Sequence, residues 1–137
     1  PVTAPLLKIL GFIAAEGTTG DDIIIISNID SEFLQNTKSA FNSLGVPSFY
    51  TNKGINSACR IFIEIVKALE GFRKSKQKKV CPLVFNLEKK QIAQYLSAYF
   101  EGNGGVEEHG ITACSKSKRL ISEISYLLYY FGIIARI

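Results

Sequence analysis

One pattern of residue classes occurs twice in this chain of 137 residues, and no gap separates the corresponding positions. Gly17 and Gly104 are 87 positions apart, and so are Gly45 and Gly132. Apolar and small polar residues recur at the same distance over about 30 positions, a length that indicates two copies of one supersecondary unit. The two copies are therefore expected to share one order of helices and strands.

The first copy alternates between helical and extended patterns. Helices are predicted where apolar residues recur every three or four positions, and strands where β-branched or alternating residues gather. Asp30 or Ser31 is suited to cap the second helix, and Gly45 to end it. The predicted elements are helices over 6–15, 31–44 and 64–72, a strand over 23–27, and a hairpin of strands 48–52 and 56–63 about Lys53-Gly54.

The second copy repeats only part of this order: a helix over 91–102, a short hairpin ending near Ser115, and a helix over 118–131. The fold class is α+β, with mostly antiparallel sheets and packed helices. The predicted division is a first repeat over 1–72, a basic linker over 73–90, and a second, truncated repeat over 91–137. Part of the apolar surface of the second copy is expected to be exposed, or covered by another chain or a further C-terminal segment.

Composition indicates a globular protein, because 47% of the residues are hydrophobic and 20% are charged. The net charge of +4 is compatible with a polyanionic partner. The longest apolar runs, such as 23–26, are too short to span a membrane, so no membrane association is expected.

The start of the chain and its cysteines bear on its cellular setting. Pro1-Val2-Thr3 lacks an initiator methionine and the basic segment of a signal peptide, which predicts a processed piece of a longer protein. Cys59, Cys81 and Cys114 have no metal-ligand spacing. We therefore expect buried, reduced thiols and an intracellular, cytoplasmic location.

The first helix of each copy ends in a similar motif. Residues 9–17 read Ile-Leu-Gly-Phe-Ile-Ala-Ala-Glu-Gly, and residues 96–104 read Leu-Ser-Ala-Tyr-Phe-Glu-Gly-Asn-Gly. Two such motifs in register, with their flanking elements, resemble the LAGLIDADG homing endonucleases over about residues 6–137. The stretch 79–82, Lys-Val-Cys-Pro, looks like the members carried in archaeal inteins. The resemblance implies a pseudo-two-fold fold of αββαββα repeats, the second incomplete.

The small residues of the two motifs suit close packing of two helices along the pseudo-two-fold axis. In this family the residues that close the helices bind a divalent metal, which activates water for attack on a phosphodiester. The resemblance implies an Mg²⁺ site at Glu16 and Asn103, with Gly17 and Gly104 beside them. Asn103 carries no charge, so this site is expected to be half-equipped.

The family also places polar or basic residues near the metals. At the 87-residue spacing these are Asn28 and Ile29 in the first copy, and Ser115 and Lys116 in the second. Lys116 is the third predicted catalytic residue, because it can stabilise the developing charge of the phosphate. Alternatively, it is a solvated lysine in front of a helix.

Double-stranded DNA is the partner that the resemblance implies, lying on the sheet. Alternation predicts one face with Ser48, Tyr50 and Asn52, and one with Asn56 and Arg60. The basic run 73–79 is either a strap that contacts phosphates or a solvated connector. The predicted DNA-binding residues are Asn28, Ser48, Tyr50, Asn52, Asn56, Arg60, Lys74, Lys76, Lys78 and Ser115.

These features support three hypotheses on function. The first is a site-specific DNA endonuclease that hydrolyses phosphodiester bonds with Mg²⁺ and whose activity is impaired by Asn103. The second is a non-catalytic nucleic-acid-binding relic, or an RNA maturase, on the same fold. The third is an insert that only supports a host protein.

Overall fold

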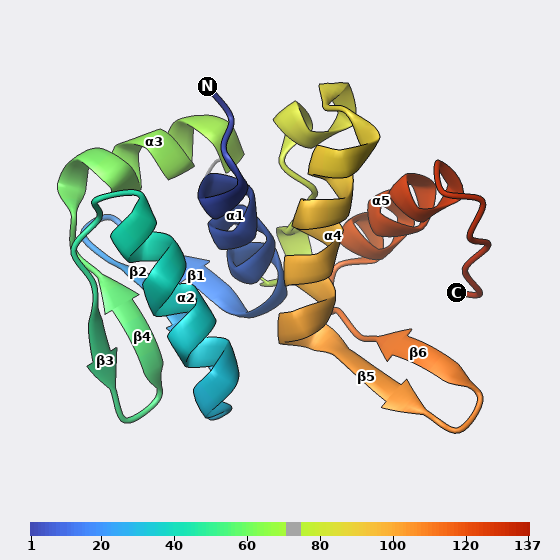
Figure 1. Cartoon of the computed structure of the whole chain (residues 1–137), viewed down its shortest axis with the longest axis horizontal. Coiled ribbons are helices and arrows are strands. Elements are labelled where there is room, and N and C mark those ends of the chain that lie inside the picture. The colour runs from blue at the N-terminus through green and yellow to red at the C-terminus, as the bar shows by residue number, and fades with distance from the viewer. Residues whose placement is uncertain (71–74) are drawn as a thin grey trace.

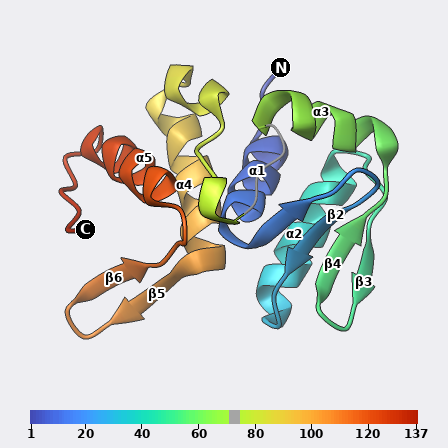
Figure 2. The same ribbon diagram turned by 180° about the vertical axis from the view of Figure 1, so that it is seen from behind.

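The computed structural model describes residues 1–70 and 75–137 of the chain. Two helices, α1 (Ala4–Glu16) and α4 (Lys89–Asn103), lie side by side at the centre, and one half of the chain flanks each of them (Figures 1 and 2). The first half adds β1 (Gly17–Thr19), β2 (Ile24–Ser27), α2 (Ser31–Ser43), β3 (Phe49–Thr51), β4 (Gly54–Ser57) and α3 (Arg60–Glu70). The second adds β5 (Gly104–Glu107), β6 (Gly110–Ala113) and α5 (Lys118–Tyr129). This confirms the predicted α+β class.

Helix α1 is the part of the core that both halves share. Pro5 lies in its first turn, where the missing N–H group costs no helical hydrogen bond, and the helix therefore begins before the predicted residue 6. Three of its side chains, Ile9, Phe12 and Ile13, belong to the core of the first half. Three others, Leu7, Leu10 and Ala14, belong to the core of the second half. The apolar residues of α1 are thus buried against both halves of the chain, whereas Lys8 is exposed.

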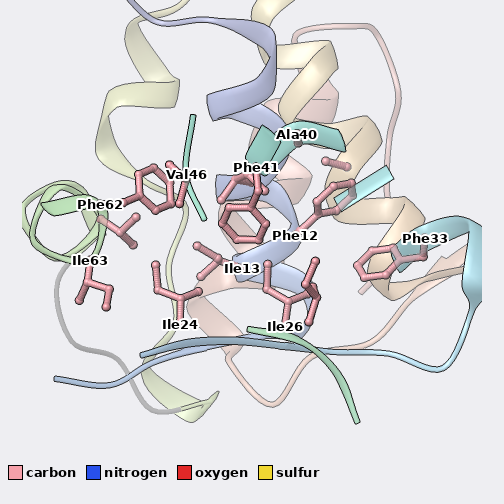
Figure 3. Packing of buried hydrophobic residues seen from close by; sticks show 14 residues of the cluster. Phe12, Ile13, Ile24, Ile26, Phe33, Ala40, Phe41, Val46, Phe62 and Ile63 are labelled. Carbon is pink, nitrogen blue, oxygen red and sulfur yellow. The ribbon is translucent and has the colours of Figure 1, made fainter. Parts of the chain in front are cut away.

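The first half forms a four-stranded antiparallel sheet in the order β1-β2-β4-β3. Ile26 of β2 lies opposite Gly17 of β1 on one side and Ile55 of β4 on the other. Figure 3 shows the side chains of Ile24 and Ile26 beneath the rings of α1 and α2. Helices thus cover one face of this sheet and leave the other face to solvent.

The repeat extends to the ends of the elements. Helix α2 begins after Asp30, whose side chain accepts a hydrogen bond from the Phe33 N–H group at 2.9 Å. Helix α5 begins after Ser117, whose Oγ accepts one from the Leu120 N–H group at 3.1 Å. The two caps, Asp30 and Ser117, are 87 positions apart, and so are the residues that they cap, Phe33 and Leu120. Of the two caps that the sequence allowed for α2, the structure has Asp30.

The chain leaves both of these helices through a glycine in the left-handed region. Gly45 has a φ angle of 69° and Gly132 one of 73°, which other residues rarely adopt. The predicted end of α2 at Gly45 is therefore confirmed, and its counterpart follows α5.

The predicted strand over 56–63 is wrong. Strand β4 ends at Ser57, whose Oγ donates to the Pro47 carbonyl oxygen at 2.7 Å and accepts from the Cys59 N–H group at 3.3 Å. These bonds turn the chain, and α3 begins at Arg60. The apolar residues after Arg60 had suggested a continuing strand, but the buried ones, Phe62, Ile63 and Val66, have the spacing of a helix face.

The cysteines only partly follow the prediction of buried thiols. Cys81 is buried, Cys59 is half-buried and Cys114 is exposed; all three are free thiols. Cys114 directly follows β6, whose residues are all exposed. None of the helices in the described residues has both the length and the apolar composition required to cross a membrane.

Candidate active site at the ends of the two central helices

Helices α1 and α4 approach each other most closely at two glycines. A Cβ atom placed on Gly11 would lie 2.6 Å from the Tyr95 carbonyl oxygen and 2.7 Å from the Ala98 Cβ atom. One placed on Gly102 would lie 2.8 Å from the Ala15 Cβ atom. These distances are shorter than van der Waals contact, so the two backbones pack directly on each other. The small residues of the motifs therefore have the packing role that the sequence predicted.

Both helices end in the same geometry. Gly17 and Gly104 have φ −94° with ψ 156° and 158°, and their N–H groups donate to the Ile13 and Phe100 carbonyl oxygens. A Cβ atom on Gly17 would lie 2.8 Å from the Ile13 oxygen, and one on Gly104 2.5 Å from the Phe100 oxygen. Each strand therefore starts so close to its own helix that only glycine fits.

Glu16 and Asn103 are the last residues of α1 and α4, whose ends lie side by side (Figures 1 and 2). A Cβ atom on Gly102, directly before Asn103, would lie 3.4 Å from the Glu16 Cγ atom. A pocket of about 400 Å³ opens beside these ends. It is lined by Ala14, Ala15, Lys78, Asn103, Cys114, Ser115 and Lys116. The structure thus gathers four of the residues singled out in the sequence in one pocket, and Glu16 lies next to it.

Asn103 is held as a hydrogen-bond donor. Its Nδ2 donates to the Tyr99 hydroxyl at 3.1 Å and to the Cys114 carbonyl oxygen. A carbonyl oxygen can only accept, so the amide nitrogen must face Cys114. A carboxylate at this position would place two acceptors against each other. Asn103 therefore ties α4 to the end of β6, and its amide oxygen is the atom left to bind a cation.

Lys78 of the linker caps the carboxyl end of α1. Its Nζ lies 2.9 Å from the Ile13 carbonyl oxygen and 3.3 Å from that of Ala14. Its own carbonyl oxygen accepts a hydrogen bond from Ser117 Oγ. A positive charge is favourable at the negative end of a helix dipole. Lys78, predicted as a phosphate contact on a linker, thus joins the end of α1 to the start of α5.

Two titratable groups at the site have shifted pKa values. Burial raises the pKa of the Glu16 carboxyl group above its ordinary value, and the Lys78 ammonium group partly offsets the rise. Burial likewise raises the pKa of the Tyr99 hydroxyl, and the hydrogen bond with Asn103 partly offsets it. The Glu16 carboxylate is thus a half-buried anion at a helix end, where a nearby cation is stabilising.

The oxygen donors at this site match Mg²⁺ in chemistry but are few. Glu16 offers a carboxylate, Asn103 an amide oxygen, and the helix ends offer carbonyl oxygens, all of them hard ligands. In the described ranges, 1–70 and 75–137, no three His, Cys, Asp or Glu side chains gather around one point. The residues therefore fit one Mg²⁺ that keeps most of its water ligands, and they do not fit a symmetric pair of ions.

The positions predicted beside the metal differ between the halves. Ser115 and Lys116 line the pocket. Asn28 instead shapes the turn into α2, because its side-chain oxygen accepts a hydrogen bond from the Asp30 N–H group at 2.8 Å. Ile29 is 94% exposed and has no polar group to offer. Among the described residues, the basic side chains that line this pocket are therefore Lys78 of the linker and Lys116 of the second half.

The residues predicted to contact DNA divide between the two faces of the first sheet. Tyr50 lies opposite Ile55, and Ile55 opposite the fully buried Ile26. Residues directly opposite share a face, so Tyr50 and its neighbour Ser48 are on the helix-covered side. Lys38 of α2 confirms this, because its Nζ lies 3.0 Å from Ser48 Oγ and 5.8 Å from the centre of the Tyr50 ring.

The open face of this sheet carries Asn56, flanked by Phe49 on β3 and Ile25 on β2. Of the other predicted residues, Asn52 lies in the turn between β3 and β4, and Arg60 begins α3. Lys76 is exposed in a short 3₁₀ turn, Ser75–Gln77, and Lys74 lies outside the described residues. The open face is therefore less polar than the sequence pattern predicted.

Three residues of the site were not identified from the sequence: Tyr99, Ser117 and the Cys114 carbonyl group. Tyr99 precedes Asn103 by four positions, a spacing that places both on one helix face. Ser117 corresponds to Asp30 in the repeat, so it could have been identified as a helix cap. No sequence signal marks the carbonyl group of Cys114.

Comparison with known proteins agrees with this geometry. Residues 90–137 match the family model of the LAGLIDADG-like domain. This part of the chain therefore carries a LAGLIDADG-like domain. The match covers α4 with its closing motif, the β5–β6 hairpin and α5. These elements are the second copy of the repeat, and the first copy has the same order of helix, hairpin and helix.

Three curated relatives are similar to nearly the whole chain. They are the replication factor C small subunit of Pyrococcus horikoshii, with 28% identity over 139 residues, the RNA polymerase subunit Rpo1C of Methanocaldococcus jannaschii, with 30% over 132, and the DNA polymerase II large subunit of Thermococcus kodakarensis, with 29% over 140. These alignments cover 97%, 90% and 94% of this chain. The chain spans 15%, 15% and 8% of the length of these relatives.

Proposed function

We propose that this chain is the endonuclease domain of an archaeal intein, and that it binds double-stranded DNA and hydrolyses its phosphodiester bonds weakly. The observation that carries the proposal is the joint between α1 and α4. It places Glu16 and Asn103 on adjacent helix ends, beside a pocket with two lysines, Lys78 and Lys116. An anionic metal ligand next to cationic groups is the arrangement that phosphate hydrolysis requires.

The relatives favour the interpretation that this chain is an inserted domain, and they disfavour the interpretation that it is a working part of one particular protein. One stretch of about the length of this chain is similar to 15% or less of three proteins with different names. A segment that a replication factor, an RNA polymerase or a DNA polymerase needs for its own activity would not recur in all three. A self-contained insert would, and the resemblance to intein-borne family members gives its type.

The side chains of the chain have separate tasks in this proposal. Glu16 would hold the cation at the carboxyl end of α1, and the amide oxygen of Asn103 would be the ligand from α4. Lys116 would approach the phosphate from the end of β6 and stabilise its negative charge during attack. Lys78 would keep the end of α1 in place through the Ile13 and Ala14 carbonyl oxygens. When bound, Mg²⁺ would lower the pKa of a coordinated water and so supply the attacking hydroxide.

Asn103 is the reason to expect weak cleavage. An amide supplies no negative charge, so the second half contributes less to cation binding than Glu16 does. Loss of one preorganised charged group costs on the order of 3 kcal/mol, or roughly a hundredfold in rate. We therefore expect the chain to nick one strand of its target and to leave the other intact.

A second candidate is a DNA-binding protein without cleavage. The hydrogen bonds from Asn103 Nδ2 to Tyr99 and Cys114 favour it, because they give the amide a structural role that aspartate cannot fill. Under this alternative, Asn103→Asp would lose these bonds and gain no activity.

Cleavage of a supercoiled plasmid in Mg²⁺ separates the two candidates. The plasmid carries the joined gene sequences that flank the coding stretch of the insert. We expect slow nicking by the natural chain, double-strand cleavage by Asn103→Asp, and neither by Glu16→Gln. If the natural chain and Asn103→Asp both leave the plasmid supercoiled while both bind it, the non-catalytic candidate replaces the endonuclease.

DNA binding is tested separately, by fluorescence anisotropy with a labelled duplex over a range of salt concentrations. Counterion release predicts a steep loss of affinity from low to moderate salt. Lys116→Gln should lower both the affinity and the salt dependence, and Lys53→Gln, in the exposed turn between β3 and β4, is the matched control. Absence of binding at low salt would exclude both candidates and leave the structural insert.

A further inference from the structure

The hydroxyl group of Ser117 joins the linker to the second half beside the pocket. Ser117 is fully buried, with 0% of its surface exposed. Its Oγ donates a hydrogen bond to the Lys78 carbonyl oxygen in the linker and accepts one from the Leu120 N–H group of α5 at 3.1 Å. One buried side chain thus acts as donor and as acceptor, and it ties the linker to the start of α5.

The corresponding cap of the first half can make only one of these bonds. Asp30 is exposed, and its carboxylate accepts from the Phe33 N–H group at 2.9 Å. An ionised carboxylate has no proton to donate, so aspartate at position 117 could cap α5 but could not bond to a carbonyl oxygen. Serine and aspartate are both good helix caps. The contact with the linker, and not the capping of α5, therefore requires a donor at position 117.

The place of Ser117 also determines the places of the two lysines that line the pocket, Lys78 and Lys116. The backbone of Lys78 is held by the Ser117 hydroxyl, and its Nζ lies 2.9 Å from the Ile13 carbonyl oxygen at the end of α1. Lys116 directly precedes Ser117 in the chain. The Ser117 N–H group donates to Ser115 Oγ at 3.1 Å and so closes a turn around Lys116.

The first half forms the same turn without a lysine. The Asp30 N–H group donates to Asn28 Oδ1 at 2.8 Å, as the N–H group of Ser117 does to Ser115, and the residue between them is Ile29. The turn itself therefore needs no buried hydroxyl group. The hydroxyl group and its bond to the linker belong to the half that brings a lysine to the pocket.

We propose that Ser117 is a positioning residue of this site, whose hydroxyl group holds Lys78 and Lys116 in the relative positions in which they act on a phosphate. This inference rests on the endonuclease function proposed above. Ser117 contacts neither the phosphate nor the cation and acts through the two lysines. A displacement of about 1 Å at such a site can cost roughly a hundredfold in rate. Displaced lysines still attract the phosphate backbone, so cleavage should suffer more than DNA binding.

Lysine labelling tests the arrangement without metal or DNA. Reductive methylation of the folded chain, followed by mass spectrometry, measures how fast each amine reacts. Ser117→Ala should increase the rate at Lys78 severalfold, because the linker is released from α5. Lys38 is the matched control, since its Nζ also donates to a backbone carbonyl oxygen, that of Ser48 in the first half. Its rate should stay the same, whereas a general loss of stability would raise both rates.

Ser117→Thr tests whether the hydroxyl group itself is responsible. Threonine keeps the donor and is also a good helix cap, so Lys78 should react as slowly as in the natural chain. Equal increases in Ser117→Thr and Ser117→Ala would exclude the hydroxyl group as the cause. Ser117→Cys, a weaker donor of similar size, replaces Ser117→Ala in the comparison if the alanine variant does not fold.

Single-turnover nicking of the target plasmid tests the role in cleavage. Ser117→Ala should lower the rate about tenfold, with a much smaller loss of DNA affinity in fluorescence anisotropy. Asp30→Ala removes the equivalent cap from the first half and should not lower the rate. Equal losses of rate in the two variants would overturn the inference, because the effect would then come from the loss of a helix cap.

Failure of this inference differs from failure of the proposed function. If the natural chain never nicks the plasmid, the proposed function is overturned, and the role of Ser117 in cleavage is overturned with it. If the natural chain nicks the plasmid and Ser117→Ala nicks it equally fast, the inference alone fails. An unchanged rate of methylation at Lys78 in Ser117→Ala also overturns the inference, whether or not the chain cleaves DNA.

Discussion

The two halves of this protein begin alike and end differently. Each opens with a helix that stops at a glycine-led strand, and each then builds a hairpin and a second, side-chain-capped helix. The first half continues into a second hairpin and α3, which bury its apolar residues. Val46, after α2, is 8% exposed, whereas the corresponding Ile133 is 51% exposed. Equivalent sequence positions therefore contribute different amounts to stability.

This difference shows that local rules and long-range packing act separately. Caps and helix-ending glycines need only neighbours a few positions away, so both halves have them. Burial of a sheet face needs elements distant in sequence, and only the first half has them in the described residues. The predictions below use paired positions in the two halves to test this separation.

The largest effect should come from the joint that both halves share. Gly11→Val would force atoms into the Tyr95 carbonyl group and the Ala98 side chain, and should lower the free energy of unfolding by about 4 kcal/mol. Urea unfolding measures this change. Gly105→Val in β5 is the control, since its nearest neighbour, Thr112 Oγ1, lies 3.5 Å from an added Cβ atom. A loss of similar size in both variants would show that the helix joint has no special role.

The next comparison is between Ile24 and Ile111. Ile24→Ala should cost about 3 kcal/mol, because it opens a cavity in a filled core. Ile111→Ala should change the free energy of unfolding by less than about 0.5 kcal/mol at low protein concentration. Chemical denaturation of both variants checks this. Equal losses would mean that the β6 face is covered in the isolated chain.

The helix caps should give a smaller difference. Asp30→Ala should cost about 1 kcal/mol, the usual value for an exposed cap. Ser117→Ala should cost about 2 kcal/mol, because its buried hydroxyl also donates to the Lys78 carbonyl oxygen. Thermal unfolding of the two variants provides the ranking. The opposite order would show that the Lys78 contact adds no stability.

The smallest effect concerns Glu16 and pH. Its pKa is raised in the folded state, so the protonated form favours folding, and this contribution is lost as pH rises through the folded pKa. Glu16→Gln should therefore increase stability slightly at neutral pH without metal. The gain should vanish below the ordinary pKa of a glutamate. Denaturation across this pH range detects the trend, and Glu32→Gln, at an exposed position in α2, is the control. A gain that persists in acid would point to packing instead of charge.

Much of the fold followed from patterns that lie within a few residues. The 87-residue repeat predicted the order of helix, hairpin and helix in both halves. The motifs predicted two helices packed through small residues, with Glu16 and Asn103 on neighbouring ends. The order of the elements depends on propensity, caps and glycines, which act locally and are therefore readable from a single sequence. The pairing of the two helices was implied by the resemblance to the LAGLIDADG family.

Other features were decided by contacts between distant segments. Periodicity could not predict that β4 ends at Ser57, because the chain turns there through a hydrogen bond that Ser57 Oγ donates to the carbonyl oxygen of Pro47, ten positions away. Periodicity also could not predict which face of the sheet Tyr50 and Ser48 lie on. The pairing of β3 with β4 and the contacts with Lys38 place them on the helix-covered face. In the sequence, nothing distinguished Lys78 from the other lysines of the linker.

Only the packed structure sets the Lys78 ammonium group against the end of α1 and gives the amide of Asn103 its partner at Cys114. Residues 65 and 11 positions apart meet in these bonds, and their energy depends on geometry that no local pattern specifies. The motif and the difference between Glu16 and Asn103 can be read from the sequence, but the partners that hold these two helix ends were decided by tertiary packing.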